Sequence, residues 1–97
     1  MTEIIFHPSA QQDIVRLVNF LMEADIDVAL ATFDIIHSGI SPLKNHPEIG
    51  RPTEEDSLRE LVISRGSTGY IALYEFDELR DLIIVLRVKH QREDGFD

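Results

Sequence analysis

The spacing of apolar residues along the chain changes from a helical period to a strand period. The segment from Thr2 to His7 is short, partly β-branched and aromatic, and it ends at Pro8, which can open a helix but cannot sit inside a sheet ladder. We therefore predict a short strand that leads directly into a helix, with His7 or Ser9 as the N-cap. This helix is expected from Ser9 to about Ala24, because apolar residues follow the i, i+3, i+4, i+7 pattern at Ile14, Leu17, Val18 and Leu21.

A second helix is predicted from about Asp27 to Leu43, after a tight turn in which Asp25 or Asp27 can serve as the N-cap. Its buried face is expected to consist of Leu30, Phe33, Ile36 or His37, and Ile40. In the first helix, three residues widen the apolar stripe: Val15, Phe20 and Met22. The polar residues of the first helix are expected to face water: Gln11, Gln12, Asp13, Arg16, Asn19 and Glu23. The two helices would form a hairpin that needs a sheet to cover its remaining apolar surface.

The second half of the chain has the alternating pattern that is typical of strands. A polar stretch from Lys44 to Ser57 is predicted to be a long loop. Three strands are predicted after it, at 58–64, 70–76 and 81–90. The last of them is the most apolar, so we expect it to lie in the centre of the sheet or to be covered on both faces. The order β-α-α-β-β-β predicts an α+β fold, with a helical hairpin packed on one face of a mainly antiparallel sheet.

Composition narrows the classes of protein that this chain can belong to. Its 97 residues suffice for one core, so residues 1–97 are predicted to form a single domain. The absence of cysteine excludes disulfides and thiolate chemistry, and it is typical of a cytoplasmic protein. No apolar run approaches the ~18 residues of a membrane span, so we expect no membrane association. The net charge of −9 makes direct binding to nucleic acid unfavourable.

Few motifs carry recognisable chemistry. The four histidines lack metal-ligand spacing and no nucleotide-binding motif is present, so neither a metal ion nor a cofactor is expected. One basic cluster lies near the C-terminal end: Arg87, Lys89, His90 and Arg92. Strand alternation would place Arg87 and Lys89 on one face and His90 and Arg92 on the other. The cluster could hold a phosphate beside His90 as acid or base, or it could be a solvated strand end, which composition alone favours.

Four segments together resemble the RelE/ParE toxin superfamily, and especially its ParE branch of plasmid-stabilisation toxins. They are residues 49–52 (IGRP), 58–63 (LRELVI), 70–74 (YIALY) and 85–93 (VLRVKHQRE). The resemblance is close in the second half of the chain and extends to the layout of the first half. It implies the fold order derived above. It also implies a toxin of a bacterial type II toxin–antitoxin module, held inactive by a cognate antitoxin.

The resemblance implies two different activities. ParE-like members are described as poisoning DNA gyrase by binding it, whereas RelE-like members are ribosome-dependent mRNA endonucleases that need several basic residues. The net charge of −9 and the presence of only two lysines favour the gyrase inhibitor, which is not an enzyme. In the nuclease alternative, the catalytic residues would be Arg59, Arg87 and His90. A third alternative is an inactive homologue that acts only in autoregulation of its operon.

The resemblance to the RelE/ParE superfamily also suggests which residues contact the partners of this chain. We expect the cellular target to contact the C-terminal cluster of Arg87, Lys89, His90 and Arg92. We expect the antitoxin to contact Arg59, Tyr70 and Tyr74, by adding a strand or a helix to the toxin. DNA would be bound only indirectly, through the antitoxin. An exposed apolar groove beside the helices would favour a homodimer or a complex with a partner.

Overall fold

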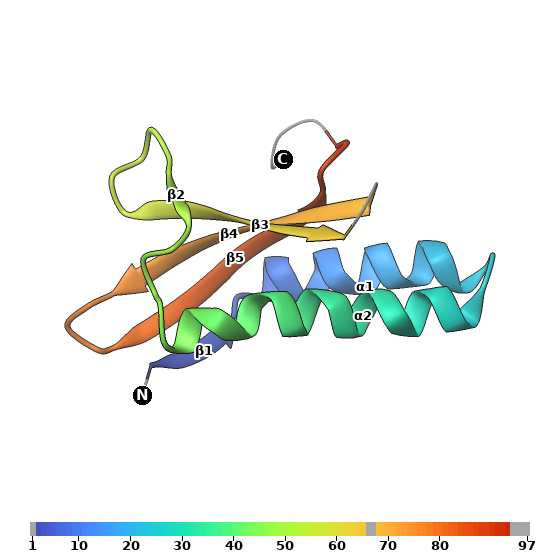
Figure 1. Ribbon diagram of the computed structural model, residues 1–97, viewed down its shortest axis with the longest axis horizontal. Coiled ribbons are helices and arrows are strands. Elements are labelled where there is room, and N and C mark those ends of the chain that lie inside the picture. The colour runs from blue at the N-terminus through green and yellow to red at the C-terminus, as the bar shows by residue number, and fades with distance from the viewer. Residues whose placement is uncertain (1, 66–67, 94–97) are drawn as a thin grey trace.

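The computed structural model describes residues 2–65 and 68–93, which form a helical hairpin on a five-stranded sheet (Figure 1). The elements are β1 (Glu3–Phe6), α1 (Pro8–Met22), α2 (Ile26–Ile40), the 3-10 turn η1 (Ser41–Lys44), β2 (Arg51–Pro52), β3 (Leu58–Arg65), β4 (Thr68–Asp77) and β5 (Leu82–His90). The end of the hairpin that holds the α1–α2 turn extends beyond the strands. The predicted α+β fold is confirmed.

The sheet has the strand order β1-β5-β4-β3-β2. β1 pairs with β5 in parallel, and every other pair of neighbouring strands is antiparallel. The sheet is therefore mainly antiparallel, as predicted. The apolar strand β5 lies in the interior of the sheet, between β1 and β4, but β4 occupies the central position that we had expected for β5.

Each helix begins at a residue whose side chain accepts a hydrogen bond from the first turn. His7 precedes Pro8, and its Nδ1 accepts from the backbone N–H of Ser9 at 3.0 Å. Asp25 plays the same role for α2, since its Oδ1 accepts from the N–H of Asp27 at 2.9 Å. These bonds satisfy amide groups that have no partner inside the helix, so two of the predicted caps are confirmed.

Several predicted boundaries differ from the structure, and three of the differences have local causes. α2 ends at Ile40, earlier than predicted, because Pro42 has no N–H to continue the helix and the chain tightens into η1. The predicted loop of residues 44–57 contains the two-residue strand β2, which pairs with the start of β3. β5 begins at Leu82 because Asp81 has a φ of 53°, in the left-handed region that interrupts a strand.

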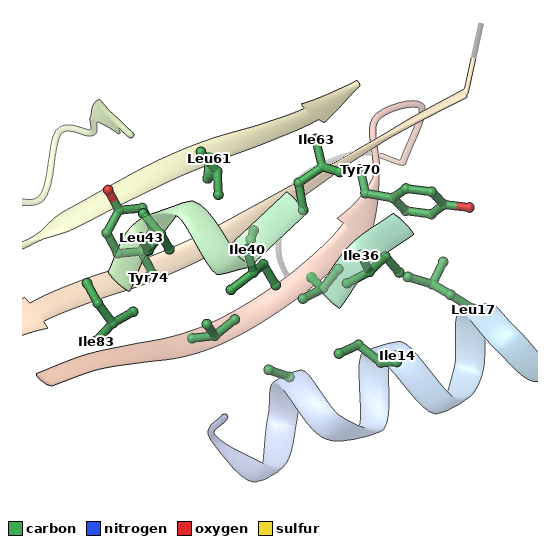
Figure 2. Packing of buried hydrophobic residues seen from close by; sticks show 14 residues of the cluster. Ile14, Leu17, Ile36, Ile40, Leu43, Leu61, Ile63, Tyr70, Tyr74 and Ile83 are labelled. Atoms are coloured by element: carbon green, nitrogen blue, oxygen red, sulfur yellow. The ribbon is translucent and has the colours of Figure 1, made fainter. Parts of the chain in front are cut away.

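The core lies between the helices and the face of the sheet that they cover (Figure 2). Its buried members are Ala10, Ile14, Leu17, Ile36, Ile40, Leu43, Leu61, Ile63, Tyr70, Ala72, Tyr74, Ile83, Val85 and Val88. Ile36 and Ile40 are buried as predicted. Leu30 and Phe33 were expected on the same face of α2, but they are 56% and 43% exposed. α2 buries the smaller side chains of Ala29 and Thr32 instead.

Tyr74 anchors the loop that follows the helices. Its ring is fully buried, and its hydroxyl accepts from the N–H of Gly50 and donates to the C=O of Pro47, each at 2.9 Å. A Cβ atom at position 50 would lie 2.6 Å from the tyrosine ring, so only glycine allows this approach. Burial raises the pKa of the Tyr74 hydroxyl. Tyr74 is thus part of the interior of the folded chain.

Asp13 of α1 binds the last strand at the point where β1 no longer covers its edge. β1 pairs with β5 only as far as Val85. Beyond it, the N–H of Val88 donates to Asp13 Oδ2 at 2.9 Å, and the Arg87 guanidinium donates to both carboxylate oxygens at 2.8 and 3.2 Å. Asp13 is 6% exposed, so the prediction that it faces water is wrong. The carboxylate serves as an acceptor for the edge of a strand.

The first prediction concerns the buried hydroxyl. Tyr74→Phe should lower the free energy of unfolding by about 1–2 kcal/mol, because it leaves the N–H of Gly50 and the C=O of Pro47 without their partner. Tyr70→Phe is the matched control, since that ring is also buried but its hydroxyl makes no hydrogen bond to the residues that the structure describes. Urea unfolding at neutral pH measures both changes. Equal losses would show that the Tyr74 hydroxyl contributes nothing specific.

The second prediction concerns stability at alkaline pH, and it follows from the raised pKa of the Tyr74 hydroxyl. The unfolded chain ionises this hydroxyl near its ordinary pKa of about 10, whereas the folded chain keeps it protonated to higher pH. The stability advantage of the wild-type chain over Tyr74→Phe should therefore be constant below about pH 10 and shrink above it. Urea unfolding of the two chains on both sides of that pH tests this. An advantage that grows with pH would contradict it.

A third prediction concerns Asp13. Asp13→Ala should lower the free energy of unfolding by about 2–3 kcal/mol, somewhat less than for a fully buried ion pair, because the Arg87 side chain is 28% exposed. Arg16→Ala, on the same helix, removes an exposed pair with Glu93 and should cost less than about 1 kcal/mol. Urea unfolding of the two variants tests the difference. Similar losses would mean that Asp13 acts only as a surface charge.

Candidate functional site

A cavity of about 610 Å³ opens between the helical hairpin and the ends of β4 and β5. We call it the hairpin cavity. Its lining comprises Arg16, Leu17, Phe20, Leu21, Val28, Thr32, Tyr70, His90, Arg92 and Glu93. The lining is mainly apolar, and charged side chains come from α1 and from the residues at and after the end of β5. A cavity of this kind suits an apolar side chain with polar groups around it.

His90 reaches the hairpin cavity because β5 contains a bulge. The register between β4 and β5 shifts at Leu86, which is an extra residue on β5. The shift places Val88 in the core, and His90, two residues on, shares its face. His90 pairs with Tyr70 across the strands, and the two rings meet edge to face with centroids 5.4 Å apart. The N–H of Arg92 donates to His90 Nδ1 at 3.1 Å.

Arg16 and Glu93 form an ion pair at the rim of the hairpin cavity. The two terminal guanidinium nitrogens of Arg16, Nη1 and Nη2, donate to the two carboxylate oxygens of Glu93 at 2.8 and 3.1 Å. This hydrogen bonding lowers the pKa of the Glu93 carboxyl and raises the pKa of Arg16. Lys89 Nζ also donates to the backbone C=O of Glu93 at 3.0 Å. The segment after β5 is therefore tied to α1 and to its own strand.

The structure divides the predicted basic cluster into two parts. Arg87 is bound to Asp13, and Lys89 is bound to the backbone at Glu93. His90 and Arg92 line the hairpin cavity instead. The sequence pattern had put these same two pairs on opposite faces, and the structure gives each pair a different environment.

The residues predicted to contact an antitoxin do not share one surface. Arg59 donates to the C=O of Glu48 at 3.0 Å and to the C=O of Gly50 at 2.9 Å. It therefore holds the same loop that Tyr74 anchors from inside the core. Tyr74 is fully buried and offers no surface to a partner, whereas Tyr70 contributes to the lining of the hairpin cavity. Of the three residues, only Tyr70, which is 3% exposed, lines the hairpin cavity, and contact of the three with an antitoxin stays a prediction.

The residues of the nuclease alternative are likewise separated. Arg59 lies on β3 and binds the loop, and Arg87 lies two strands away and binds Asp13. Only His90 faces the hairpin cavity, together with Arg16 and Arg92. Among residues 2–65 and 68–93, no group of three histidine, aspartate, glutamate or cysteine side chains is placed to hold a metal ion.

Seven residues that line the hairpin cavity were not predicted as site residues from the sequence: Arg16, Leu17, Phe20, Leu21, Val28, Thr32 and Glu93. Phe20 is the clearest case, because its side chain is 79% exposed although we expected it to widen the buried stripe of α1. A large aromatic residue beside Asn19 and one turn after Arg16 was the available signal. Phe20 is exposed at a part of the hairpin that extends beyond the sheet (Figure 1). No local sequence pattern reveals this extension.

Comparisons with known proteins agree on one family. The sequence matches the family model described as the ParE toxin of the type II toxin–antitoxin system, parDE, over residues 4–95. A curated relative, Toxin RelE3 of Caulobacter vibrioides, is 28% identical over 93 residues, which are 96% of this chain and 98% of the relative.

Two solved structures have a similar fold. A chain of the chromosomal ParDE TA system from P. aeruginosa has a TM-score of 0.76 and 20% identity, over 93% of this chain and 96% of that chain. A chain of the intact E. coli RelBE toxin–antitoxin complex has a TM-score of 0.69 and 13% identity, over 96% of this chain and all of that chain. The family match covers nearly the whole sequence, and this chain therefore belongs to the ParE toxin family of type II toxin–antitoxin systems, within the RelE/ParE superfamily.

Proposed function

We propose that this toxin acts in the cytoplasm by binding other proteins, with a cognate antitoxin as its inhibitor and DNA gyrase as its target. The family assignment and the similarity to chains from ParDE and RelBE complexes support an antitoxin partner. Within residues 2–65 and 68–93, Arg59, Arg87 and His90 do not come together at one site, which supports a target that is a protein. In this proposal the complex contacts DNA through the antitoxin and not through the acidic toxin.

The internal binding of Arg87 is the observation that carries the proposal. A nuclease of this fold needs cations that are free to contact the scissile phosphate. Here the Arg87 guanidinium is held by the Asp13 carboxylate, and the Arg59 guanidinium is held by two backbone carbonyls. A net charge of −9 also opposes docking on ribosomal RNA. The chain therefore suits protein recognition better than RNA cleavage.

The hairpin cavity is the surface that we assign to recognition. Its apolar lining includes Tyr70 and the exposed Phe20, which can accept an apolar anchor from a partner. His90 and Arg92 lie at the same cavity and are the retained candidates for contact with the target. An antitoxin segment bound in the cavity would cover these two residues. Inhibition would then follow from simple occlusion.

The RelE-like nuclease remains the second candidate, because one observation favours it. His90, Arg16 and Arg92 meet around a single cavity, and they comprise one potential acid or base and two cations. A curated relative that covers 96% of this chain is also named Toxin RelE3. An inactive homologue that acts only in operon autoregulation is the third candidate, and it predicts no effect on growth.

The fourth prediction separates these functions. Expression of the chain without its antitoxin should stop bacterial growth and cause filamentation, and the purified chain should inhibit supercoiling by gyrase. Primer extension on cellular mRNA should find no new cuts. Discrete cuts in translated mRNA would support the nuclease instead. Normal growth together with normal supercoiling would support the inactive homologue.

Variants connect the activity to the proposed surface. The double variant His90→Ala and Arg92→Ala should weaken gyrase inhibition by about tenfold or more, as expected when contacts worth about 1.4 kcal/mol are lost. Arg51→Ala is the control, because Arg51 is an exposed arginine on β2, at the other edge of the sheet. A similar loss in both variants would indicate that the hairpin cavity is not the target surface.

A further inference from the structure

α2 carries a second apolar face that its own fold does not cover. Its buried residues are Ala29, Thr32, Ile36 and Ile40. A second set lies four, three and four residues apart along the helix, and we call it the outer stripe: Ile26, Leu30, Phe33 and His37. This spacing places all four side chains on one side of the helix. The exposed fractions of Ile26, Leu30 and Phe33 are 54%, 56% and 43%.

The outer stripe is an ordered surface at one of its ends. The rings of Phe33 and His37 lie 4.3 Å apart, and the ring of His37 lies 5.3 Å from that of Phe6 on β1. The aromatic contacts fix the side chains in place where the stripe meets the sheet. The apolar surface therefore continues from α2 onto the first strand.

The outer stripe is separate from the hairpin cavity. α2 contributes Val28 and Thr32 to that cavity. Successive residues of a helix turn by about 100°, so Val28 and Leu30 lie on nearly opposite sides of α2. A partner on the outer stripe would thus leave the hairpin cavity open. The inference goes beyond the proposed function, because it concerns a different face of the hairpin.

The charges beside the outer stripe indicate what could cover it. Asp27 and Asp34 are exposed, and their spacing of seven residues puts them along one flank of the stripe. Neither carboxylate forms an ion pair within residues 2–65 and 68–93. The sequence of α2 contains no lysine or arginine. The face is therefore apolar with an acidic border.

We propose that the outer stripe docks a basic amphipathic helix of a partner protein. Such a helix would pack its apolar residues on Leu30 and Phe33, and it would place lysine or arginine beside Asp27 and Asp34. A second copy of this chain fits less well, because it would bring the same aspartates together and would combine two chains that each carry a net charge of −9.

A membrane is the other occupant that the apolar character of α2 suggests. The segment Ile26–Lys44 is 19 residues long with a mean hydropathy of 1.2, and so it could span a membrane by length and composition alone. However, α2 packs against α1 and β3 as the core helix of a globular domain does. The acidic border also disfavours binding to an anionic lipid surface. The test below includes this alternative.

The experiment uses the full chain and a pair of synthetic helical peptides. Both peptides carry leucine at heptad spacing, and they differ only in having lysine or glutamate along the flank. Fluorescence anisotropy at low and high salt measures their binding. The lysine peptide should bind at least about tenfold more tightly than the glutamate peptide, and added salt should reduce the difference.

Two pairs of substitutions test the two features of the surface. Leu30→Gln with Phe33→Gln should weaken binding of the lysine peptide by about tenfold or more. Asp27→Asn with Asp34→Asn should remove most of the preference for the lysine peptide over the glutamate peptide. This second pair keeps the test valid if the first pair of substitutions disturbs folding. Leu79→Gln is the control for an exposed apolar residue, because Leu79 is 99% exposed on the loop between β4 and β5. It should leave binding unchanged.

Any one of the following results would overturn the proposal that a basic helix binds the outer stripe. Equal binding of the two peptides, or binding that the aspartate variants leave unchanged, would remove the basic helix as the occupant. A dimer seen by sedimentation and lost in the Leu30 and Phe33 variant would identify a second copy instead. Binding to phosphatidylcholine vesicles that this variant loses would identify a membrane. Phe20→Gln, in the hairpin cavity, should affect gyrase inhibition but not peptide binding, so the two proposals fail independently.

Discussion

The carboxylate of Asp13 joins the first helix to the last strand, and much of the molecule depends on this contact. It accepts from the N–H of Val88 where β1 has stopped covering the edge of β5, and it pairs with Arg87. The contact fixes α1 over the sheet and so helps to define the position of the hairpin cavity. It also removes one arginine from the set that could contact a phosphate. One ion pair therefore stabilises the fold and restricts the chemistry that the fold can perform.

The helical hairpin carries the surfaces that we propose for recognition of other molecules. One of its sides closes over the sheet, a second borders the hairpin cavity, and a third carries the outer stripe on α2. The sheet contributes Tyr70 and His90 to the cavity, but the guanidinium groups of Arg59 and Arg87 are held by backbone carbonyls and by a carboxylate. A chain built in this way is suited to recognition through apolar contact, with a few charges that set orientation.

Local patterns in the sequence were enough to predict the fold. The helix caps, the turn between the helices and the alternation in β3, β4 and β5 depend on near neighbours in the chain. Features decided by packing between distant elements were missed. α2 has two apolar stripes with nearly the same spacing, and only the position of the sheet selects Ile36 over Phe33 for the core. Likewise, the burial of Asp13 depends on Val88, seventy-five positions later in the sequence.

The parallel pairing of β1 with β5 joins the earliest and the latest strands of the chain, with Glu3 opposite Leu82. During synthesis, β1 leaves the ribosome long before the strand with which it must pair. The sheet of a nascent chain thus stays open until β5 has emerged, because a contact so distant in sequence cannot form earlier. This domain reaches its native shape only after β5 has been translated. An antitoxin already present in the cell can then capture each new molecule as it folds.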